Sequence, residues 1–518
     1  MAANEQGPPK CSFFQEGSVS QLESLAMDQS DEQVALHRSR ILRKLDMRLV
    51  PLMLITYGLQ FLDKALLGYA AVFTFRQDTN CHSNDEQHLH GQEYSWVGSI
   101  FYFGYMLFEY PLAGLLHSFT TPLYLGFFIF AWGVCVVMTN FCVSFTGLMI
   151  NRFVLGALES VVAPCFVVIT GIYLSTVHEH LVLTSFPADW YTPKEQPIRQ
   201  VLWFLGTPVF GIFGGLLGYA LGNTHTEVTS WRLLYIVFGS VTALWGIFFA
   251  YAFPASPREA SFLPDEDRVM SILRSDSIGQ SVEPKWKWSQ VKEAFLDLKT
   301  YIFFTIGIFN TIPAGSLSNF SSLLIKGFGF TAVQTQLIGI PSHVVQIVSI
   351  LVAGIVSTKV ADMRLLSMSF CVIPSIIGTA LVYSLPSIDK WGRVVSVWII
   401  YTNSASLAVS FSVIGGNVAG YTKKTTVTFL LFLGYCVGNI IAPQCFREEE
   451  EQEGYPTAII AMVVSFCVLF IAPLLLRFLY SKENKRRDAQ GVRFVASSGS
   501  GGDEDLTDME NPNFRYAL

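Results

Sequence analysis

The chain is divided into long apolar runs, each long enough to cross a lipid bilayer. A helix needs about 20 apolar residues to span the hydrocarbon core. By that measure the sequence predicts twelve spans, near 50–73, 93–116, 121–141, 146–172, 198–222, 231–253, 300–325, 331–357, 364–384, 392–415, 425–446 and 457–480. Only 14% of the 518 residues are charged, against about 25% in an ordinary soluble domain. We therefore expect an all-α membrane protein and not a soluble multidomain enzyme.

Polar segments divide these runs into two equal groups. The longest interior polar segment, 254–299, separates the sixth run from the seventh. It predicts a central cytoplasmic loop between two six-helix bundles, at 41–253 and 300–480. The polar ends of the chain, 1–40 and 481–518, are expected to be disordered cytoplasmic segments. The first of these ends lacks the apolar core of a signal peptide.

The placement of lysine and arginine predicts the orientation of the spans. Basic residues precede the first span, at Arg38, Arg40, Arg43, Lys44 and Arg48, and recur in the central loop. Loops rich in lysine and arginine stay on the cytoplasmic side. Both termini are therefore expected in the cytoplasm, and an even number of spans is consistent with this because it places the two termini on the same side.

Several spans carry ionisable or polar side chains. An ionisable group within a span costs about 2.5–3.5 kcal/mol on insertion scales and so needs a reason. These side chains are Asp63 and Lys64 in the first span, Tyr102, Tyr105 and Glu109 in the second, Arg152 and Glu159 in the fourth, Asn319 in the seventh and His343 in the eighth. Residues three, four or seven apart share a helix face. Polar faces on several helices predict a shared hydrophilic cavity. Structural alternatives stay open: Asp63 and Lys64 could be interfacial, Arg152 could pair with Glu159 between helices, and His343 could be a packing residue.

Glycine and proline add a second pattern within the spans. Gly214, Gly218 and Gly222 form a ridge of small residues that lets another helix approach closely. Prolines at 164, 208, 313 and 443 are expected to interrupt their helices. Such interruptions are tolerated where the backbone lines a cavity.

Other function classes lack support in the sequence. A net charge of −6 provides no basic field for nucleic acid. Gly415 and Gly420 have P-loop spacing, but Tyr421 follows where a lysine is required, so no ATP site is expected. The histidine-containing segment 82–90 fits a solvated loop better than a metal site. We expect no catalytic constellation, no enzyme activity, no cofactor and no metal.

Seven stretches carry a family resemblance: LDKALLGYAAVF (62–73), YSWVGSIFYFGYMLFEYP (94–111), RFVLGALE (152–159), WYTPKEQPIR (190–199), KGFGFT (326–331), GNVAGYTKKTT (416–426) and GYCVGNIIAPQ (434–444). They resemble the major facilitator superfamily, and within it the fungal allantoate permease family of anion:cation symporters. The resemblance covers about residues 40–480. It implies proton-coupled import of a small organic anion or vitamin, such as allantoate or nicotinate, at the plasma membrane.

The resemblance also implies roles for particular residues. Arg152 matches the family's fourth-helix arginine, which is linked to proton coupling, and Lys64 and Glu109 match charged positions of the first two helices. Asn417 and Lys423 belong to the tenth-helix signature. We predict substrate binding by Lys64, Tyr102, Tyr105, Arg152, Asn319, His343 and Asn417, and proton coupling by Asp63, Glu109, Arg152 and Glu159. The expected partners are a small organic anion, protons and the lipid bilayer, and the chain is expected to act as a monomer. The alternative is an exporter of a small metabolite or toxin with the same fold.

One segment departs from the family pattern. Residues 173–189 stand between the fourth span and the Trp190 stretch, where family members run on almost directly. We hypothesise a retained short intron in the gene, with a genuine cytoplasmic loop extension as the alternative. Sequencing cDNA that spans the codons for residues 173–189 distinguishes the retained intron from the loop extension.

Overall fold

The computed structural model describes residues 31–78, 92–115, 120–142, 144–169, 190–191, 196–224, 227–254, 262–264, 267, 286–360, 362–450, 453–490 and 505–518. In these ranges the regular structure is helical and no strand occurs. The hypothesised insertion at 173–189 lies outside the described residues, as does the histidine-containing segment 82–90.

The helices form two groups in chain order. The first group is α2 (Asp31–Ala71), α3 (Phe75–Asp78), α4 (Glu93–Leu115), α5 (Thr121–Met138), η2 (Thr139–Phe141), α6 (Phe145–Glu159), α7 (Val162–Ile169), α8 (Gln196–Phe204), α9 (Gly206–Gly222) and α10 (Ser230–Ala252). The second group is α12 (Trp288–Leu296), α13 (Leu298–Gly327), α14 (Ala332–Ile338), α15 (Ile340–Lys359), α16 (Arg364–Phe370), α17 (Ile373–Ser384), α18 (Lys390–Ile400), η4 (Tyr401–Asn403), α19 (Ser404–Asn417), α20 (Tyr421–Gln444), η5 (Glu448–Glu450) and α21 (Pro456–Ala489).

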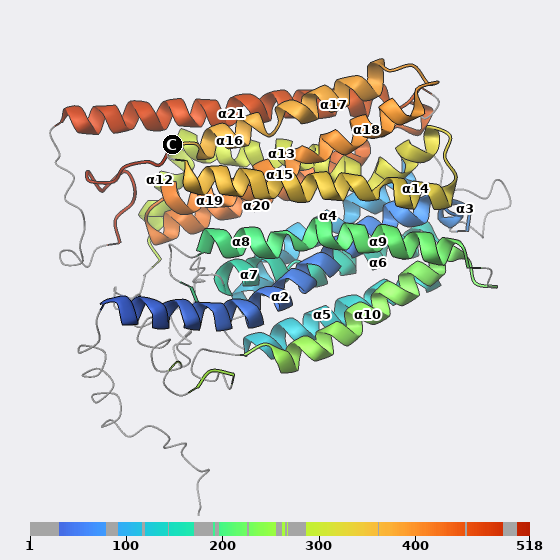
Figure 1. Cartoon of the computed structure of the whole chain (residues 1–518), viewed down its shortest axis with the longest axis horizontal. Helices are drawn as coiled ribbons and strands as arrows, with labels where there is room; N and C mark the ends of the chain where they lie inside the picture. The colour runs from blue at the N-terminus through green and yellow to red at the C-terminus, as the bar shows by residue number, and fades with distance from the viewer. Residues whose placement is uncertain are drawn as a thin grey trace, which may run out of the picture.

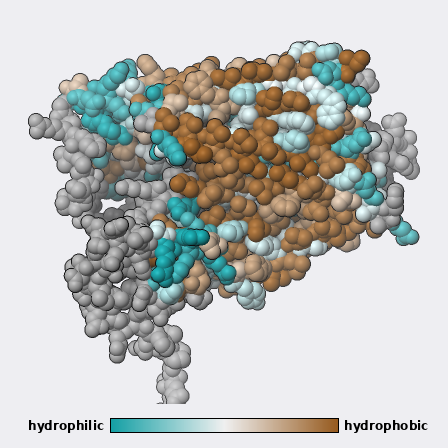
Figure 2. Space-filling view, in the orientation of Figure 1, coloured by the Kyte–Doolittle hydropathy of each residue, from teal (hydrophilic) through white to brown (hydrophobic). Residues whose placement is uncertain are grey.

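The predicted spans correspond to helices of membrane length. Eleven helical stretches within the described ranges are long and apolar enough to cross a bilayer. The 23-residue α4 occupies the position of the remaining predicted span, the second. On the face shown in Figure 2, apolar side chains cover the middle and polar ones gather toward the two ends. The predicted all-α membrane fold is therefore confirmed.

The two groups of helices pack side by side as an N-terminal half and a C-terminal half (Figure 1). Contacts between the halves join α4 to α20, α2 to α13 and α9 to α15. The first turns of α2, the last turns of α21 and residues 505–518 lie at one end of the molecule, which we call the terminal end. We call the other end, which holds α3 and α14, the distal end.

Several spans are built from two helices, and proline explains two of the breaks. Proline removes a backbone donor and clashes with the carbonyl of the preceding turn. Thus α6 ends at Glu159 before Pro164, and α8 ends at Phe204 before Pro208. These two predicted interruptions are confirmed. The other two are wrong: Pro313 lies inside a continuous α13 and Pro443 lies in the last turn of α20.

Glycines allow α4 and α6 to cross with their backbones almost in contact. A Cβ atom at Gly156 would lie 1.9 Å from the carbonyl oxygen of Phe101, and one at Gly104 would lie 2.1 Å from that of Phe153. No other residue fits there without moving a helix. This crossing fixes α6, and with it Glu159, against α4.

Replacing Gly156 with alanine is therefore expected to lower the thermal stability of the detergent-solubilised protein. Overpacking of a tight site costs about 1–3 kcal/mol. The measurement is the melting temperature from size-exclusion profiles of a fluorescent fusion after heating. Gly327→Ala is the matched control, because no atom lies within 4 Å of a Cβ at that position. Equal melting temperatures for the two variants would contradict the tight crossing.

The expectation of a disordered tail at 481–518 is wrong for the residues that the structure describes there. Helix α21 continues to Ala489, and residues 505–518 pack against the C-terminal half. The backbone of Ala517 exchanges two hydrogen bonds with the Asn417 side chain, at 2.6 and 3.0 Å. Arg487 donates to the carbonyl oxygens of Asp508 and Phe514. Residues 505–518 are therefore held by contacts with residues far away in the sequence, which the composition of the tail does not reveal.

Candidate functional site

A cavity of about 120 Å³ lies between the two halves. Its walls come from α2, α4, α8 and α9 on one side and from α13, α15, α18, η4, α19 and α20 on the other. The lining residues are Tyr57, Gln60, Phe61, Lys64, Tyr102, Phe204, Thr207, Asn310, Ala314, Leu317, Ser318, Gln346, Ile400, Tyr401, Asn403, Ser404, Leu407, Tyr435 and Asn439. Among these lining residues, Lys64 alone carries a charge. The predicted shared cavity therefore exists, and the charged side chain in its wall is a cation.

Lys64 stands between the cavity and a buried carboxylate. Its ammonium nitrogen lies 3.4 Å from Oε2 of Glu159, whose side chain is completely buried. Neither carboxylate oxygen of Glu159 accepts a hydrogen bond from the residues that the structure describes. The same ammonium lies 5.4 Å and 5.3 Å from the ring centres of Phe101 and Tyr105. Rings at this distance stabilise a cation through their negative faces.

A second pair of opposite charges lies deeper in the N-terminal half. Asp63 is buried and accepts a hydrogen bond from the indole nitrogen of Trp132. Arg152 donates a 2.7 Å hydrogen bond to the hydroxyl of Tyr235 and interacts electrostatically with both Asp63 and Glu159. Arg152 is not among the cavity-lining residues, so its predicted contact with substrate has no counterpart in this arrangement.

Tyrosine rings from both halves cluster next to Lys64. The rings of Tyr102 and Tyr105 lie 6.1 and 6.4 Å from Tyr435 of the other half. Tyr102 lines the cavity, whereas Tyr105 packs behind Lys64. Glu109 is buried one turn further along α4 and interacts electrostatically with Lys64. The predicted face of α4 therefore points toward the Lys64 region.

The C-terminal half contributes amide side chains that are not among the predicted substrate-binding residues. Asn403 donates a 3.3 Å hydrogen bond to the side-chain oxygen of Asn310, and Gln346 donates a 3.0 Å bond to Ser404. The nitrogen of the Asn310 amide and the oxygen of the Asn403 amide have no partner among the described residues. Each amide lies within an apolar run, and that local signal could have identified them. The cavity thus offers one cation and several neutral polar groups.

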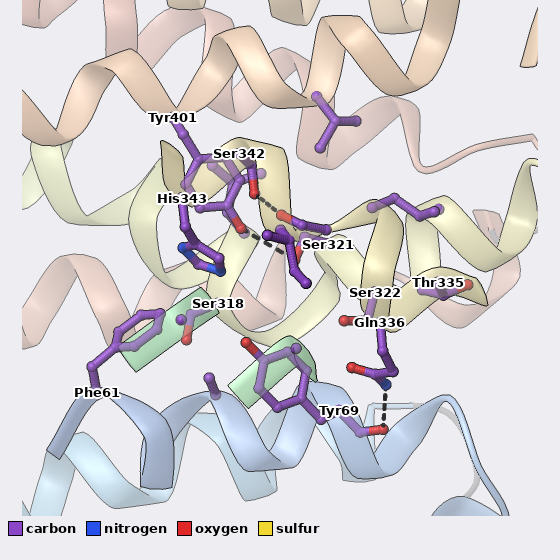
Figure 3. Close-up of a pocket in the computed structure, with 18 residues that line it drawn as sticks. Phe61, Tyr69, Ser318, Ser321, Ser322, Thr335, Gln336, Ser342, His343 and Tyr401 are labelled. Atoms are coloured by element: carbon purple, nitrogen blue, oxygen red, sulfur yellow. Dashed lines mark hydrogen bonds between the residues drawn. The ribbon is translucent and has the colours of Figure 1, made fainter. Parts of the chain in front are cut away.

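His343 lies beside the cavity, in a smaller chamber of about 20 Å³ between the halves (Figure 3). Its imidazole lies edge-on to the rings of Phe61 and Tyr401, at 5.8 and 5.5 Å. A Cβ atom at Gly211 of α9 would lie 2.5 Å from that imidazole. The glycine-rich face of α9 therefore accommodates side chains of the C-terminal half, and His343 is packed between the halves.

Polar contacts join the halves at the distal end. The Tyr94 hydroxyl donates to the Asn319 carbonyl at 3.0 Å, and Lys326 donates to the Val72 carbonyl at 2.8 Å. Ser99 donates to the carbonyl of Ile440 at 2.8 Å. The Asn319 side chain bonds to Gly315 of its own helix and does not line the cavity. These contacts join the two halves at the distal end, which we call the distal closure, and Asn319 takes part in them through its backbone carbonyl.

The structure places the predicted substrate-binding residue Asn417 outside the cavity. It lies at the last residue of α19 and binds the docked tail through its amide. Lys423 is buried close by and pairs with Glu293, Asp297 and Asp508. The tenth-helix signature therefore contributes to the dock of residues 505–518, because its side chains point toward the terminal end.

Comparisons with known proteins agree with this architecture. Residues 181–443 match the model of the Major Facilitator Superfamily. The chain is 32% identical to the uncharacterized transporter C757.13 of Schizosaccharomyces pombe over 95% of this chain and 90% of that protein. It is 29% identical to the allantoate permease of Saccharomyces cerevisiae over 96% and 90% of the two chains. A bacterial homolog of the human lysosomal transporter Spinster, solved in an inward-facing and unoccupied conformation, has a TM-score of 0.58 at 16% identity, covering 86% of this chain and 98% of that one. The chain therefore belongs to the major facilitator superfamily, among its fungal permeases, as a multi-pass membrane transporter.

Proposed function

We propose that this transporter imports a small organic anion across the plasma membrane together with protons. The observation that carries the proposal is Lys64, the charged side chain in the wall of the central cavity, with Glu159 directly behind it. A cation in a water-poor cavity attracts a carboxylate strongly, because the local dielectric constant is low. The likeness to a permease named for allantoate supports the same substrate class.

Neutral groups opposite Lys64 would complete substrate recognition. The unpartnered amide atoms of Asn310 and Asn403 can donate to and accept from a polar substrate. A buried polar atom without a partner costs free energy, about 1–3 kcal/mol. Binding a substrate that satisfies these atoms recovers that energy. The substrate is therefore proposed to be a carboxylate that also carries amide, hydroxyl or ring-nitrogen groups.

Competition for Lys64 would couple the anion to a proton. A substrate carboxylate that pairs with Lys64 weakens the ion pair between Lys64 and Glu159. A buried carboxylate without its counter-charge is strongly disfavoured, so Glu159 takes up a proton in the substrate-bound state. Asp63 keeps its contact with Trp132 during this exchange. Substrate and proton would then cross together.

Rocking of the two halves would expose the cavity to each side in turn. The basic residues at the terminal end indicate that this end faces the cytoplasm, which makes the distal end the outer one. Closure there by Tyr94 and Lys326 corresponds to a state that is sealed from outside. If more protons than substrate charges cross, the membrane potential contributes about 2.3 kcal/mol per charge per 100 mV.

Uptake of labelled nicotinate, allantoate and pantothenate into transport-deficient yeast tests this function. Accumulation at an outside pH of 5 is expected to exceed that at pH 7 and to collapse when a protonophore is added. A fluorescent fusion reports whether the protein reaches the plasma membrane. Lower internal substrate in expressing cells than in empty cells would instead identify an exporter. Uptake that is indifferent to the protonophore would contradict proton coupling.

A further inference from the structure

Residues 505–518 form an ionic dock on the terminal end of the C-terminal half. Asp508 is 1% exposed in its side chain, and its two oxygens lie 2.7 Å from the ammonium of Lys423 and 2.9 Å from that of Lys299. Burial tends to raise the pKa of Asp508, but Lys299 and Lys423 outweigh it and lower that pKa below its ordinary value. Asp508 is therefore ionised at neutral pH and anchors the tail.

Thr507 lies at the acidic side of this dock. Its hydroxyl is completely buried, donates a 3.0 Å hydrogen bond to a carboxylate oxygen of Glu293, and accepts one from the backbone of Glu510 at 3.1 Å. A Cβ atom at Gly420 would lie 2.8 Å from the methyl group of Thr507. Because Thr507 is completely buried, the site has no room for a larger group on this hydroxyl.

Acidic side chains outnumber basic ones around Thr507: Glu293, Asp297, Asp505, Asp508 and Glu510 lie in or beside the dock, together with Lys287, Lys299, Lys423 and Arg487. Glu293, Asp297 and Asp508 share two cations, Lys299 and Lys423, which already make close ion pairs with them. A phosphate on Thr507 would add about −1.5 to −2 charges at pH 7. Because the nearby lysines are already paired, most of that charge would face carboxylates, and the tail could not remain docked.

We propose that Thr507 is a phosphorylation site and that its phosphate releases residues 505–518 from the C-terminal half. The modifying enzyme would be a serine/threonine kinase that prefers acidic substrates, since Asp505, Asp508 and Glu510 flank the acceptor. The Thr507 oxygen attacks the γ-phosphorus of ATP, and the bond between that phosphorus and the oxygen that leaves with ADP breaks. The hydroxyl proton is released, and a phosphate ester and ADP result. The kinase acts when the tail is undocked, and the phosphate then prevents redocking.

Release would also affect the loop between the halves. Helix α12 is the last part of that loop, and the tail binds this part. The backbone carbonyl of Asp505 accepts hydrogen bonds from Lys287 at 2.9 Å and from Gln290 at 3.0 Å. Undocking removes these bonds and the bond from Thr507 to Glu293. Phosphorylation would therefore loosen the attachment of the interdomain loop. This inference is independent of the identity of the transported substrate.

Hydrogen exchange of the full-length protein in nanodiscs tests the proposal. Phosphothreonine is incorporated at position 507 by amber suppression, and exchange in residues 505–518 and 286–296 is followed by mass spectrometry. We expect exchange in 505–518 at least tenfold faster than in the unmodified protein, with a smaller increase in 286–296. Phosphoserine at Ser497 is the control, because it adds a similar charge to the same tail before the docked residues. Thr507→Val replaces the hydroxyl with a methyl group, removes the two hydrogen bonds of that hydroxyl, and is expected to stay docked through Asp508.

Mass spectrometry of the protein from growing yeast supplies the second measurement. Peptides that span Thr507 are expected to carry phosphate on that residue in part of the population. Tail peptides that carry none, or phosphothreonine protein that exchanges as slowly as unmodified protein, would overturn the proposal.

Discussion

Uptake is expected to fall by at least tenfold when Lys64 is replaced by glutamine. Lys64 is the charged group in the cavity wall, so the variant loses the ion pair proposed to hold the substrate carboxylate. A hydrogen bond to a charged group contributes about 1.5–3 kcal/mol, and 1.4 kcal/mol corresponds to about tenfold in affinity. Initial rates of uptake over a range of substrate concentrations measure the loss, which should appear chiefly as weaker apparent binding.

The same variant also leaves Glu159 buried without its cation, so stability must be separated from binding. Breaking one member of a buried ion pair costs about 3–5 kcal/mol. Adding Glu159→Gln to Lys64→Gln removes the orphaned charge and is expected to restore the melting temperature but not uptake. Lys359→Gln, at an exposed lysine of α15, is the surface control and should transport normally. Uptake by Lys64→Gln above half of the unaltered rate would contradict the proposed role.

Much of the fold could be predicted from the sequence because the bilayer imposes a simple length. An apolar run of about 20 residues crosses it as a helix, and the helices found in the structure lie where those runs lie. Proline was a less reliable guide. Helices end at Glu159 and Phe204, shortly before a proline, but α13 continues through Pro313. Whether neighbouring helices can satisfy the freed carbonyl depends on packing, which the local sequence does not contain.

Part of the candidate site could be predicted because charges inside spans are rare and expensive. Lys64 and Tyr102 lie in the cavity wall, and their binding of substrate stays a prediction. Asn319 and Asn417 lie elsewhere because residue type does not show how far along a helix the cavity extends. Asn319 lies beyond it at the distal closure and Asn417 beyond it at the terminal end. The orientation of both termini and the roles in proton coupling stay predictions.

The neutral groups of the site and the docked tail were harder to predict, for different reasons. Asparagine within a span often bonds to its own helix, as Asn439 does to the carbonyl of Tyr435. Without the fold, Asn310 and Asn403 cannot be distinguished from such residues. The tail is acidic and follows a glycine- and serine-rich stretch, a composition typical of disorder. Its docking depends on Lys299 and Lys423, which are far away in sequence.

Glu159→Gln is expected to abolish concentrative uptake while preserving exchange of substrate across the membrane. Glutamine has the shape of a protonated glutamate and cannot release a proton. The variant should therefore behave permanently as the proton-bound form, in which Lys64 is free to hold the substrate. Each pH unit of gradient corresponds to about 1.4 kcal/mol per proton. Over the two units between an outside pH of 5 and a neutral cytoplasm, one coupled proton supports an accumulation of about 100-fold.

Two measurements on Glu159→Gln separate coupling from binding. The internal-to-external ratio of labelled substrate at pH 5 should fall toward one and should no longer change with the protonophore. Counterflow, in which unlabelled substrate inside the cell drives entry of labelled substrate, should continue. Asp63→Asn is the contrasting variant, because Asp63 is held by Trp132 behind the cavity and makes no ion pair with Lys64 among the described contacts. If Glu159→Gln still concentrates substrate and Asp63→Asn does not, the coupling proton is carried by Asp63. The proposal that substrate replaces Glu159 as the partner of Lys64 is then wrong.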